Sequence, residues 1–211
     1  MSELTGSGNS EQALRPTGRD EVIASTIQAA IELFSKRNPS QVSVREIAAG
    51  AGVSHALVHR YMGSKQDIFR AALAAARQEA ADYWMQEHGL SQTAGTFDST
   101  LPPGRYVRMA VRASLDGVEI SPEDLKLPHS DEMLKLLVGS GLPPIEAQAP
   151  FDIRIVLSAV TAMAAGMAIA EDFFLAQSGL QDEDPTYVHS EFNRLIRLNL
   201  SLADTRPRPA E

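Results

Sequence analysis

The chain has 211 residues, with 19 Lys and Arg, 27 Asp and Glu, five His and no Cys, which gives a formal net charge of −8. Without cysteine there is no disulfide framework, thiolate nucleophile or zinc–cysteine site, and a hydrophobic content of 44% is ordinary for a globular protein. A chain of this length buries roughly 70% of its unfolded surface, so it suits one mid-sized domain or a small domain joined to a larger one.

The charge is distributed unevenly along the chain. Residues 1–65 hold seven Lys and Arg against six Asp and Glu, a balance of +1, whereas residues 66–211 hold 12 against 21, a balance of −9. A net negative charge disfavours non-specific attraction to DNA or anionic lipid. A polyanionic partner is therefore expected to meet the N-terminal third.

No segment predicts a membrane anchor or a leader. The most apolar stretch, residues 155–170, has 16 residues without a charge, fewer than the roughly 20 that a bilayer requires. Residues 1–18 lack the cationic start and apolar run of a signal peptide, and their small polar side chains predict a flexible arm. We expect a soluble cytoplasmic protein without a membrane partner.

The first predicted helix begins at Arg19. Its apolar side chains recur at spacings of three and four, which gives one stripe on an amphipathic helix. Asn38-Pro39 ends it, because proline disfavours helical backbone at the residue before it. The stripe consists of Ile23, Ile27, Ala30, Ile31 and Phe34.

Two short helices are expected next, each with its own N-terminal cap. Ser43 and Glu46 form a capping box that opens the first, and Gly52 is placed to end it in a left-handed conformation. Ser54 caps the second, which ends near Tyr61. Two short helices joined by a tight turn have the form of a helix-turn-helix, whose second helix enters the major groove of DNA.

The remainder of the chain is expected to be helical too. No segment alternates polar and apolar residues as a strand would, so the predicted fold class is all-α with roughly nine helices. A loop is expected at 89–104 and an acidic turn at 179–185. The further predicted helices span about 66–88, 104–117, 130–139, 151–177 and 186–203.

The helix-turn-helix segment resembles a known family. The motif reads Ile47-Ala48-x-x-Ala51-Gly52-Val53-Ser54, continues from Val58 to Ile68, and follows Ala29-Ala30-x-x-Leu33-Phe34. Over residues 19–75 the chain is similar to the N-terminal region of TetR-type bacterial transcriptional regulators. It departs from their usual pattern at residues 56–57 and 59–62, while Val58 and Met62 keep an apolar character.

Ten residues are predicted to contact double-stranded DNA. A helix start carries partial positive charge that suits a phosphate, and the leading turn of the second helix meets base edges, where Ala or Leu packs on a thymine methyl and His bonds to guanine. The resemblance implies the phosphate contact of Lys65, and core packing is the alternative for Tyr61. The residues are Ser43, Arg45, Ser54, His55, Ala56, Leu57, His59, Arg60, Tyr61 and Lys65.

The resemblance also implies a homodimer that pairs through two long C-terminal helices. Small residues recur every four positions in the first of these helices and permit close approach, and the last helix carries an apolar stripe. Part of both stripes must instead fill the core of one subunit. The expected interface residues are Ala162, Gly166, Ala170, Phe192, Leu195, Ile196 and Leu202.

A small-molecule effector pocket in the body is a further implication of the resemblance. Methionine and aromatic side chains suit an adaptable apolar cavity, although each candidate also fits an ordinary core. Arg105, Arg108 and Arg112 recur at helical spacing and could meet an anionic ligand, but we expect them on a solvated face. The pocket candidates are Trp84, Tyr106, Met109, Met133, Met163, Met167 and Phe173.

These features predict a DNA-binding transcriptional regulator, a repressor that a small molecule releases from a palindromic operator. We expect an arm at 1–18, a three-helix DNA-binding domain at 19–65, an effector-binding and dimerisation domain at 66–204 and a tail at 205–211. The alternative is a helical protein-interaction module that keeps the helix-turn-helix shape without reading DNA. An enzyme is not expected, because the sequence has no Gly-x-Ser-x-Gly elbow, phosphate-binding glycine loop or His-Glu-x-x-His motif. No cofactor and no metal are expected.

Overall fold

The computed structural model describes residues 16, 18–87, 102–126, 128, 151–200 and 203–204. The predicted helix at 130–139 and most of the predicted loop at 89–104 lie outside these residues. In the described part the fold is all-α, as expected, apart from one pair of very short strands. The elements are α1 (Arg19–Lys36), the 3₁₀-helix η1 (Pro39–Gln41), α2 (Val44–Gly50), α3 (His55–Met62), α4 (Lys65–Glu87), α5 (Pro102–Leu115), α6 (Pro122–Leu125), β1 (Phe151–Asp152), α8 (Ile153–Ser178), α9 (Pro185–Leu200) and β2 (Ala203–Asp204).

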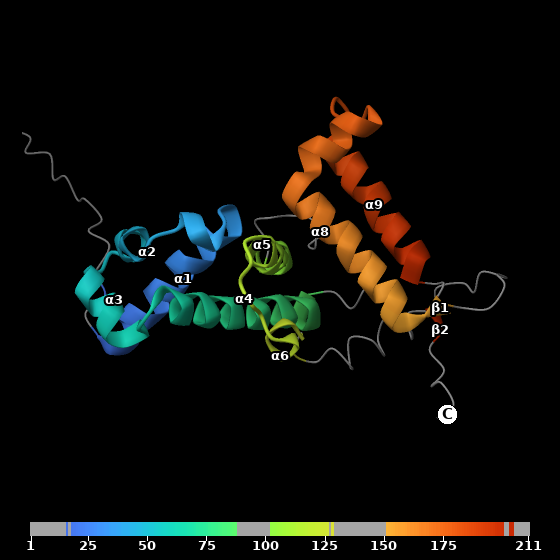
Figure 1. Ribbon diagram of the computed structural model, residues 1–211. Helices are drawn as coiled ribbons and strands as arrows, with labels where there is room; N and C mark the ends of the chain where they lie inside the picture. The colour runs from blue at the N-terminus through green and yellow to red at the C-terminus, as the bar shows by residue number, and fades with distance from the viewer. Residues whose placement is uncertain are drawn as a thin grey trace, which may run out of the picture.

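Helices α1 to α4 form a head at one end of the molecule (Figure 1), and α5 packs against both α1 and α4. The head has a core because each helix turns its apolar side to a common centre. Ile31, Phe34, Ile47, Val58 and Ile68 are fully buried there. Fully burying such a side chain contributes roughly 1.5–3 kcal/mol, so these residues hold the short helices in place.

The predicted boundary at residue 65 does not interrupt this core. Phe34 of α1 meets Phe69 of α4 edge to face, with ring centroids 5.2 Å apart and the ring planes at 83°. Met109 of α5 belongs to the same buried cluster. The head, which includes α4, is therefore continuous with α5, and a movement of α5 bears directly on the head.

The two-residue strands and the short helix α6 were not expected. Phe151 pairs with Ala203 and Asp152 with Asp204 in a parallel register, so the helices begin at 153 and end at 200 instead of 151 and 203. Two residues are too few to show an alternating pattern, so only the fold reveals the pairing. Helix α6 starts at Pro122, where the Oγ of Ser121 accepts a hydrogen bond from the next turn.

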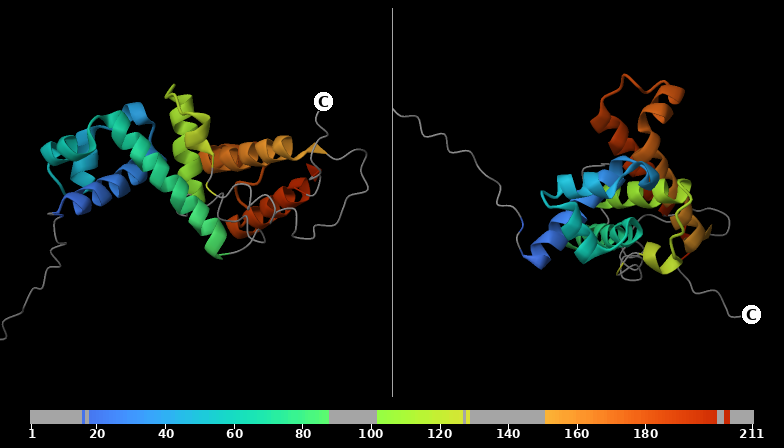
Figure 2. Two further views of the ribbon diagram at one scale, coloured as in Figure 1. Left: turned by 90° about the horizontal axis from the view of Figure 1, so that it is seen from below. Right: turned by 60° about the vertical axis from the view of Figure 1, so that its left-hand side comes forward.

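Helices α8 and α9 form an antiparallel pair at the other end of the molecule, as Figures 1 and 2 show. Between them lies a second, smaller buried cluster with Val156, Ala164, Met167 and Ile196. The backbone of α8 departs from helical geometry at Ala170, with φ −136° and ψ 36°, so the helix is kinked there.

By length and composition alone, α8 is able to cross a membrane. Its segment Ser158–Ser178 has a mean hydropathy of 1.5. This segment is longer than the uncharged run of residues 155–170, because Glu171 and Asp172 interrupt the apolar run without ending the helix. The absence of a membrane partner stays a prediction. Only 17% of its residues are buried, so few of its side chains are fully enclosed by the single chain.

Candidate nucleic-acid interface

The turn between α2 and α3 has the tight geometry that the sequence predicts. The N–H of Val53 donates to the carbonyl of Ala48 at 3.0 Å, and the N–H of Gly52 donates to Ala49 at 3.1 Å. Gly52 has φ +68°, a left-handed conformation that glycine adopts at little cost. The turn therefore sets the angle at which α3 leaves α2.

Helix α3 buries one side and exposes the other. Val58 is fully buried, and the Oγ of Ser54 caps the helix by accepting from the N–H of Leu57 at 3.3 Å. His55, Ala56 and His59 are exposed, so the leading turn of the helix points away from the head. A surface helix with one anchored side and one free polar side is able to enter a groove.

The exposed side of α3 combines imidazole, guanidinium and phenol groups. The rings of His55 and His59 lie edge to face with centroids 5.0 Å apart, and the guanidinium carbon of Arg60 lies 5.6 Å from the ring centroid of Tyr61. Leu57 is half-buried. Tyr61 is half-buried too, so its exposure does not decide between contact with a nucleic acid and packing in the core. Arg60 is exposed and carries the fixed positive charge of this face.

The start of α2 is fixed by a network around Glu46. The Glu46 carboxylate accepts from the Ser43 N–H at 2.8 Å, the Ser43 hydroxyl at 2.7 Å and the Arg37 guanidinium at 2.7 Å. The hydrogen bonds from Arg37 and Ser43 lower the pKa of Glu46 from 4.5 to about 2. The predicted capping box is confirmed, and Arg45 stands exposed beside it.

Lys65 has an anchoring role that the sequence did not indicate. Its Nζ donates to the carbonyls of Pro39 at 2.9 Å and Val42 at 3.2 Å, and the side chain is half-buried. The ammonium thus ties the start of α4 to the segment between α1 and α2. The third N–H of an ammonium is available to a phosphate in addition.

The predicted DNA-contacting residues come together at one end of the head. The starts of α2, α3 and α4 lie on the side remote from α8 and α9 in Figure 1 and in the left view of Figure 2. The end so formed carries Arg45, Arg60 and two histidines on its surface. Its chemistry fits a polyanion that is long enough to meet several helix starts at once.

The predicted pocket residues do not gather at one place. Tyr106 and Met109 are buried in the cluster that joins the head to α5, and the Tyr106 hydroxyl donates to the Leu125 carbonyl at 2.7 Å. Met167 lies in the separate cluster between α8 and α9. Met163 is half-buried and Phe173 is 62% exposed. The side chain of Trp84 and the whole of Met133 lie outside the described residues.

The predicted dimer residues divide between the core of the chain and its surface. Ile196 is buried within the single chain, whereas Ala162 and Leu195 are exposed. Phe192, Gly166 and Ala170 at the kink are half-buried. A Cβ added at Gly166 would lie 3.3 Å from the Phe174 ring. Leu202 lies outside the described residues.

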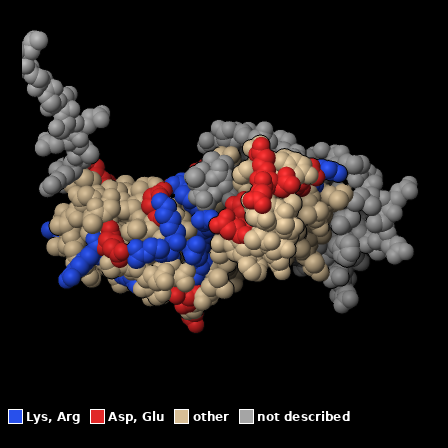
Figure 3. All heavy atoms as spheres, turned by 90° about the horizontal axis from the view of Figure 1, so that it is seen from above, with Lys and Arg blue, Asp and Glu red and all other residues tan. Residues whose placement is uncertain are grey.

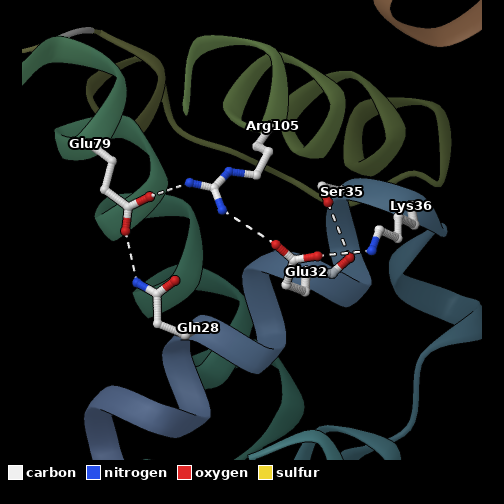
Figure 4. A network of polar contacts seen from close by, with 6 residues as sticks. All are labelled: Gln28, Glu32, Ser35, Lys36, Glu79 and Arg105. Atoms are coloured by element: carbon white, nitrogen blue, oxygen red, sulfur yellow. Dashed lines mark hydrogen bonds and ion pairs between the residues drawn. The ribbon is translucent and has the colours of Figure 1, made fainter. Parts of the chain in front are cut away.

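The expected solvated arginine face of α5 is wrong for Arg105. Its side chain is only 20% exposed and pairs with Glu32 of α1 at 3.3 Å and Glu79 of α4 at 3.2 Å. Figure 4 shows Arg105 reaching between the two helices, with Gln28 and Lys36 completing the network. Helical spacing reveals that arginines share a face but not which helices oppose them.

A second tie joins the head to the end of α5. The Asp116 carboxylate accepts from the N–H of Ser40 at 2.6 Å and from its hydroxyl at 2.7 Å. These hydrogen bonds lower the pKa of Asp116. The segment between α1 and α2 is thus held by α4 through Lys65 and by α5 through Asp116.

Comparison with known proteins agrees with this geometry. Residues 27–72 match the model of the bacterial regulatory proteins of the tetR family. An HTH-type transcriptional repressor of Mycobacterium tuberculosis and an HTH-type transcriptional regulator of Mycobacterium bovis are each 34% identical over 119 residues. That match covers 56% of this chain and 60% of each relative, so it spans well under the full length of the relatives.

The fold also has a solved counterpart. A crystal structure of a tetR-family transcriptional regulator from Streptomyces coelicolor aligns with a TM-score of 0.55 at 23% identity, over 88% of this chain and 82% of that one. The resemblance seen in the sequence is therefore confirmed. Residues 27–72 match the tetR family model, and the chain shares the overall fold of the Streptomyces coelicolor protein.

Proposed function

We propose that the protein is a DNA-binding transcriptional regulator that represses by occupying a palindromic operator. The observation that carries the proposal is α3, whose Val58 side is fully buried while its leading turn is exposed. The match of residues 27–72 to the tetR family and the repressor name of one relative support it.

In this proposal α3 lies in the major groove and the helix starts hold the backbone. His55, Ala56 and Leu57 face base edges, where they specify sequence. Arg45 and Arg60 neutralise phosphates, which positions the protein without specifying sequence. Ser43 and Ser54 place helix N-termini, with their partial positive charge, against the backbone. His59 and Tyr61 lie one turn further along, nearer to the phosphates than to the bases. Lys65 adds a phosphate contact from the position that its two carbonyl bonds fix.

We infer that two copies act together through the α8–α9 pair. One helix-turn-helix head buries little surface, and such heads commonly bind two half-sites as a dimer. Helix α8 is apolar but mostly unburied, and Phe173, Leu195 and Leu198 are exposed large apolar side chains on this pair. Exposed apolar surface of this kind marks an interaction site. A second copy covers it and places a second head for the other half-site.

Release by a small-molecule ligand completes the proposal. The dimer is expected to exist in two forms, and in one of them the distance between the two heads does not match the two half-sites. A ligand that binds this form more tightly lowers the population of the form that binds DNA. The ties of Arg105 to α1 and of Asp116 to Ser40 support this, because they pass any movement of α5 to the head. In this proposal the domain at 19–65 binds DNA, and the domain at 66–204 binds the ligand and controls DNA binding.

The test is selection of bound sequences from random duplex DNA, followed by gel-shift titration of the selected duplex. We expect an inverted repeat and an affinity that falls steeply with salt, because bound phosphates release counterions. Arg45→Gln and Arg60→Gln should each weaken binding, whereas Lys126→Gln, at an exposed position just after α6, should not. A protein that selects no sequence and binds no duplex at low salt would instead be a protein-interaction module.

A further inference from the structure

Helix α5 carries a stripe of three arginines beside its buried face. Arg105, Arg108 and Arg112 recur at spacings of three and four, while Met109 and Ala113 on the adjoining side are fully buried. The stripe lies where the head meets α8, because α5 packs against α1, α4 and α8. Figure 3 shows Lys and Arg atoms gathered over this middle part of the molecule.

The three arginines are not equally neutralised. Arg105 has two carboxylate partners, Glu32 and Glu79. Among the described residues, Arg112 has only the neutral side-chain oxygen of Asn38 as a partner, at 3.5 Å from its Nη1. Arg108 makes no hydrogen bond or ion pair with any residue that the structure describes.

The acid that acts on Arg108 and the acid four residues after Arg112 both have other partners. Glu171 of α8 is close enough to Arg108 to act on its charge, but a Glu171 oxygen is 2.6 Å from the Nε2 of His189. Asp116 follows on the same side of α5 and holds Ser40 with both oxygens. Neither acid forms a hydrogen bond to Arg108 or Arg112 in the described structure.

Arg108 and Arg112, to which no carboxylate is hydrogen-bonded in the described structure, are also partly buried. Their Nε atoms, like those of Arg77 and Arg105, are shielded from solvent and have no hydrogen-bond partner among the described residues. Burial lowers the pKa of Arg108, the neighbouring charge of Arg112 lowers it further, and Glu171 opposes both effects. Like charges at this i, i+4 spacing repel each other, and a buried donor without an acceptor costs free energy. An anion between the two side chains would relieve both penalties.

We propose that Arg108 and Arg112 bind the oxyanion group, a carboxylate or a phosphate, of a small acidic ligand where α5 meets the head and α8. Guanidinium groups suit this task, because their planar N–H donors match two oxygens at once. The inference rests on the proposed function, since it gives the chemical class of the effector. It adds that recognition occurs on the arginine side of α5 and not among the methionines.

The position of this site allows a bound ligand to affect both the head and the α8–α9 pair. Asn38, beside Arg112, follows the last turn of α1 in the head. Glu171, beside Arg108, follows the kink at Ala170 in α8. An anion bound here replaces the hydrogen bond from Arg112 to Asn38, which changes a contact of the head. It also places negative charge next to Glu171, which affects the α8–α9 pair.

The test uses the full chain and two probes, inorganic phosphate and sodium hexanoate, by isothermal titration calorimetry at constant ionic strength with chloride as the reference. We expect saturable binding of at least one probe, and the stronger probe identifies phosphate or carboxylate as the group recognised. Arg108→Gln and Arg112→Gln should each weaken it at least tenfold. Arg194→Gln, an exposed arginine on α9, is the control and should bind as the unaltered protein does.

Two further measurements keep the outcomes distinct. Thermal unfolding checks that each variant folds, and if Arg108→Gln does not fold, Arg108→Lys replaces it, for which we expect several-fold weaker binding because the two-pronged contact is lost. No saturable binding of either probe, or equal binding by all variants, overturns the proposal. Gel-shift titration without any added anion tests DNA binding separately. Intact anion binding with no DNA binding would remove the proposed function alone.

Discussion

Substitution of Lys65 by Met distinguishes the two roles of this residue, which are to hold the head together and to contact DNA. Met keeps an unbranched stem but removes the two N–H bonds to the carbonyls of Pro39 and Val42, at 2.9 Å and 3.2 Å. A hydrogen bond from a charged donor contributes roughly 1.5–3 kcal/mol when buried. Because Lys65 is only half-buried, solvent weakens both bonds, and we expect a total loss of about 1–3 kcal/mol in the free energy of unfolding, less than twice the buried value.

The magnitude is large enough to measure in a chain of this size. A loss of 1 kcal/mol lowers the midpoint of thermal unfolding by roughly 2–4 °C at 150–250 residues, so Lys65→Met should unfold about 2–12 °C below the unaltered protein. Arg45→Met is the matched variant, because Arg45 is exposed and makes no hydrogen bond to a described residue. It should unfold within about 1 °C of the unaltered protein, which corresponds to a surface change of a few tenths of a kcal/mol.

Calorimetric unfolding and gel-shift titration of both variants complete the test. We expect Lys65→Met to lose stability and DNA affinity together, and Arg45→Met to lose DNA affinity alone. If Lys65→Met unfolds at the same temperature as the unaltered protein, the carbonyl bonds do not anchor the head. In that case Lys65 acts on DNA only.

Three more predictions concern the stability of the head. Phe34→Ala should cost about 3–5 kcal/mol in urea unfolding, because the ring is fully buried against Phe69; a loss below about 1 kcal/mol would contradict the description of this core. Gly63→Ala should destabilise more than Gly52→Ala, since both have positive φ but only at Gly63 would the new Cβ lie 2.8 Å from an Asp67 oxygen; equal unfolding midpoints would refute this. The folded-state pKa of Glu46 lies near 2 against 4.5 for the free group, so its contribution is fully present above pH 4.5 and disappears as the pH falls towards 2. The stability of Glu46→Gln should therefore vary less over that interval, and parallel pH curves for the two proteins would show that Glu46 contributes nothing.

The head was predictable because its signals are local. The capping box of Ser43 with Glu46 and the left-handed turn at Gly52 involve residues that are near neighbours in the sequence. Turn and cap chemistry is fixed within one helical turn, and the apolar spacing of α1 follows from a single helix. The placement of α3 therefore followed from sequence patterns before any tertiary contact was known.

The body was less predictable because its contacts join distant parts of the chain. Nothing local indicates that Arg105 meets Glu32 and Glu79, or that Lys65 meets the carbonyl of Pro39 across 26 positions. Periodicity places the arginines of α5 on one face, but only the packing of α1 and α4 turns that face inward. The apolar stripe of α9 likewise does not distinguish Ile196, which fills the core of the chain, from its exposed neighbour Leu195.

The central claim is that two copies of the chain bind one DNA duplex, each through its helix α3. Sedimentation of the full chain with its selected duplex measures this directly, because it gives the number of chains bound per duplex at low salt and at increasing salt. The account predicts two chains on each inverted repeat, with an affinity that falls with salt. Binding of a single chain to each duplex, or no complex at any salt concentration, would contradict it.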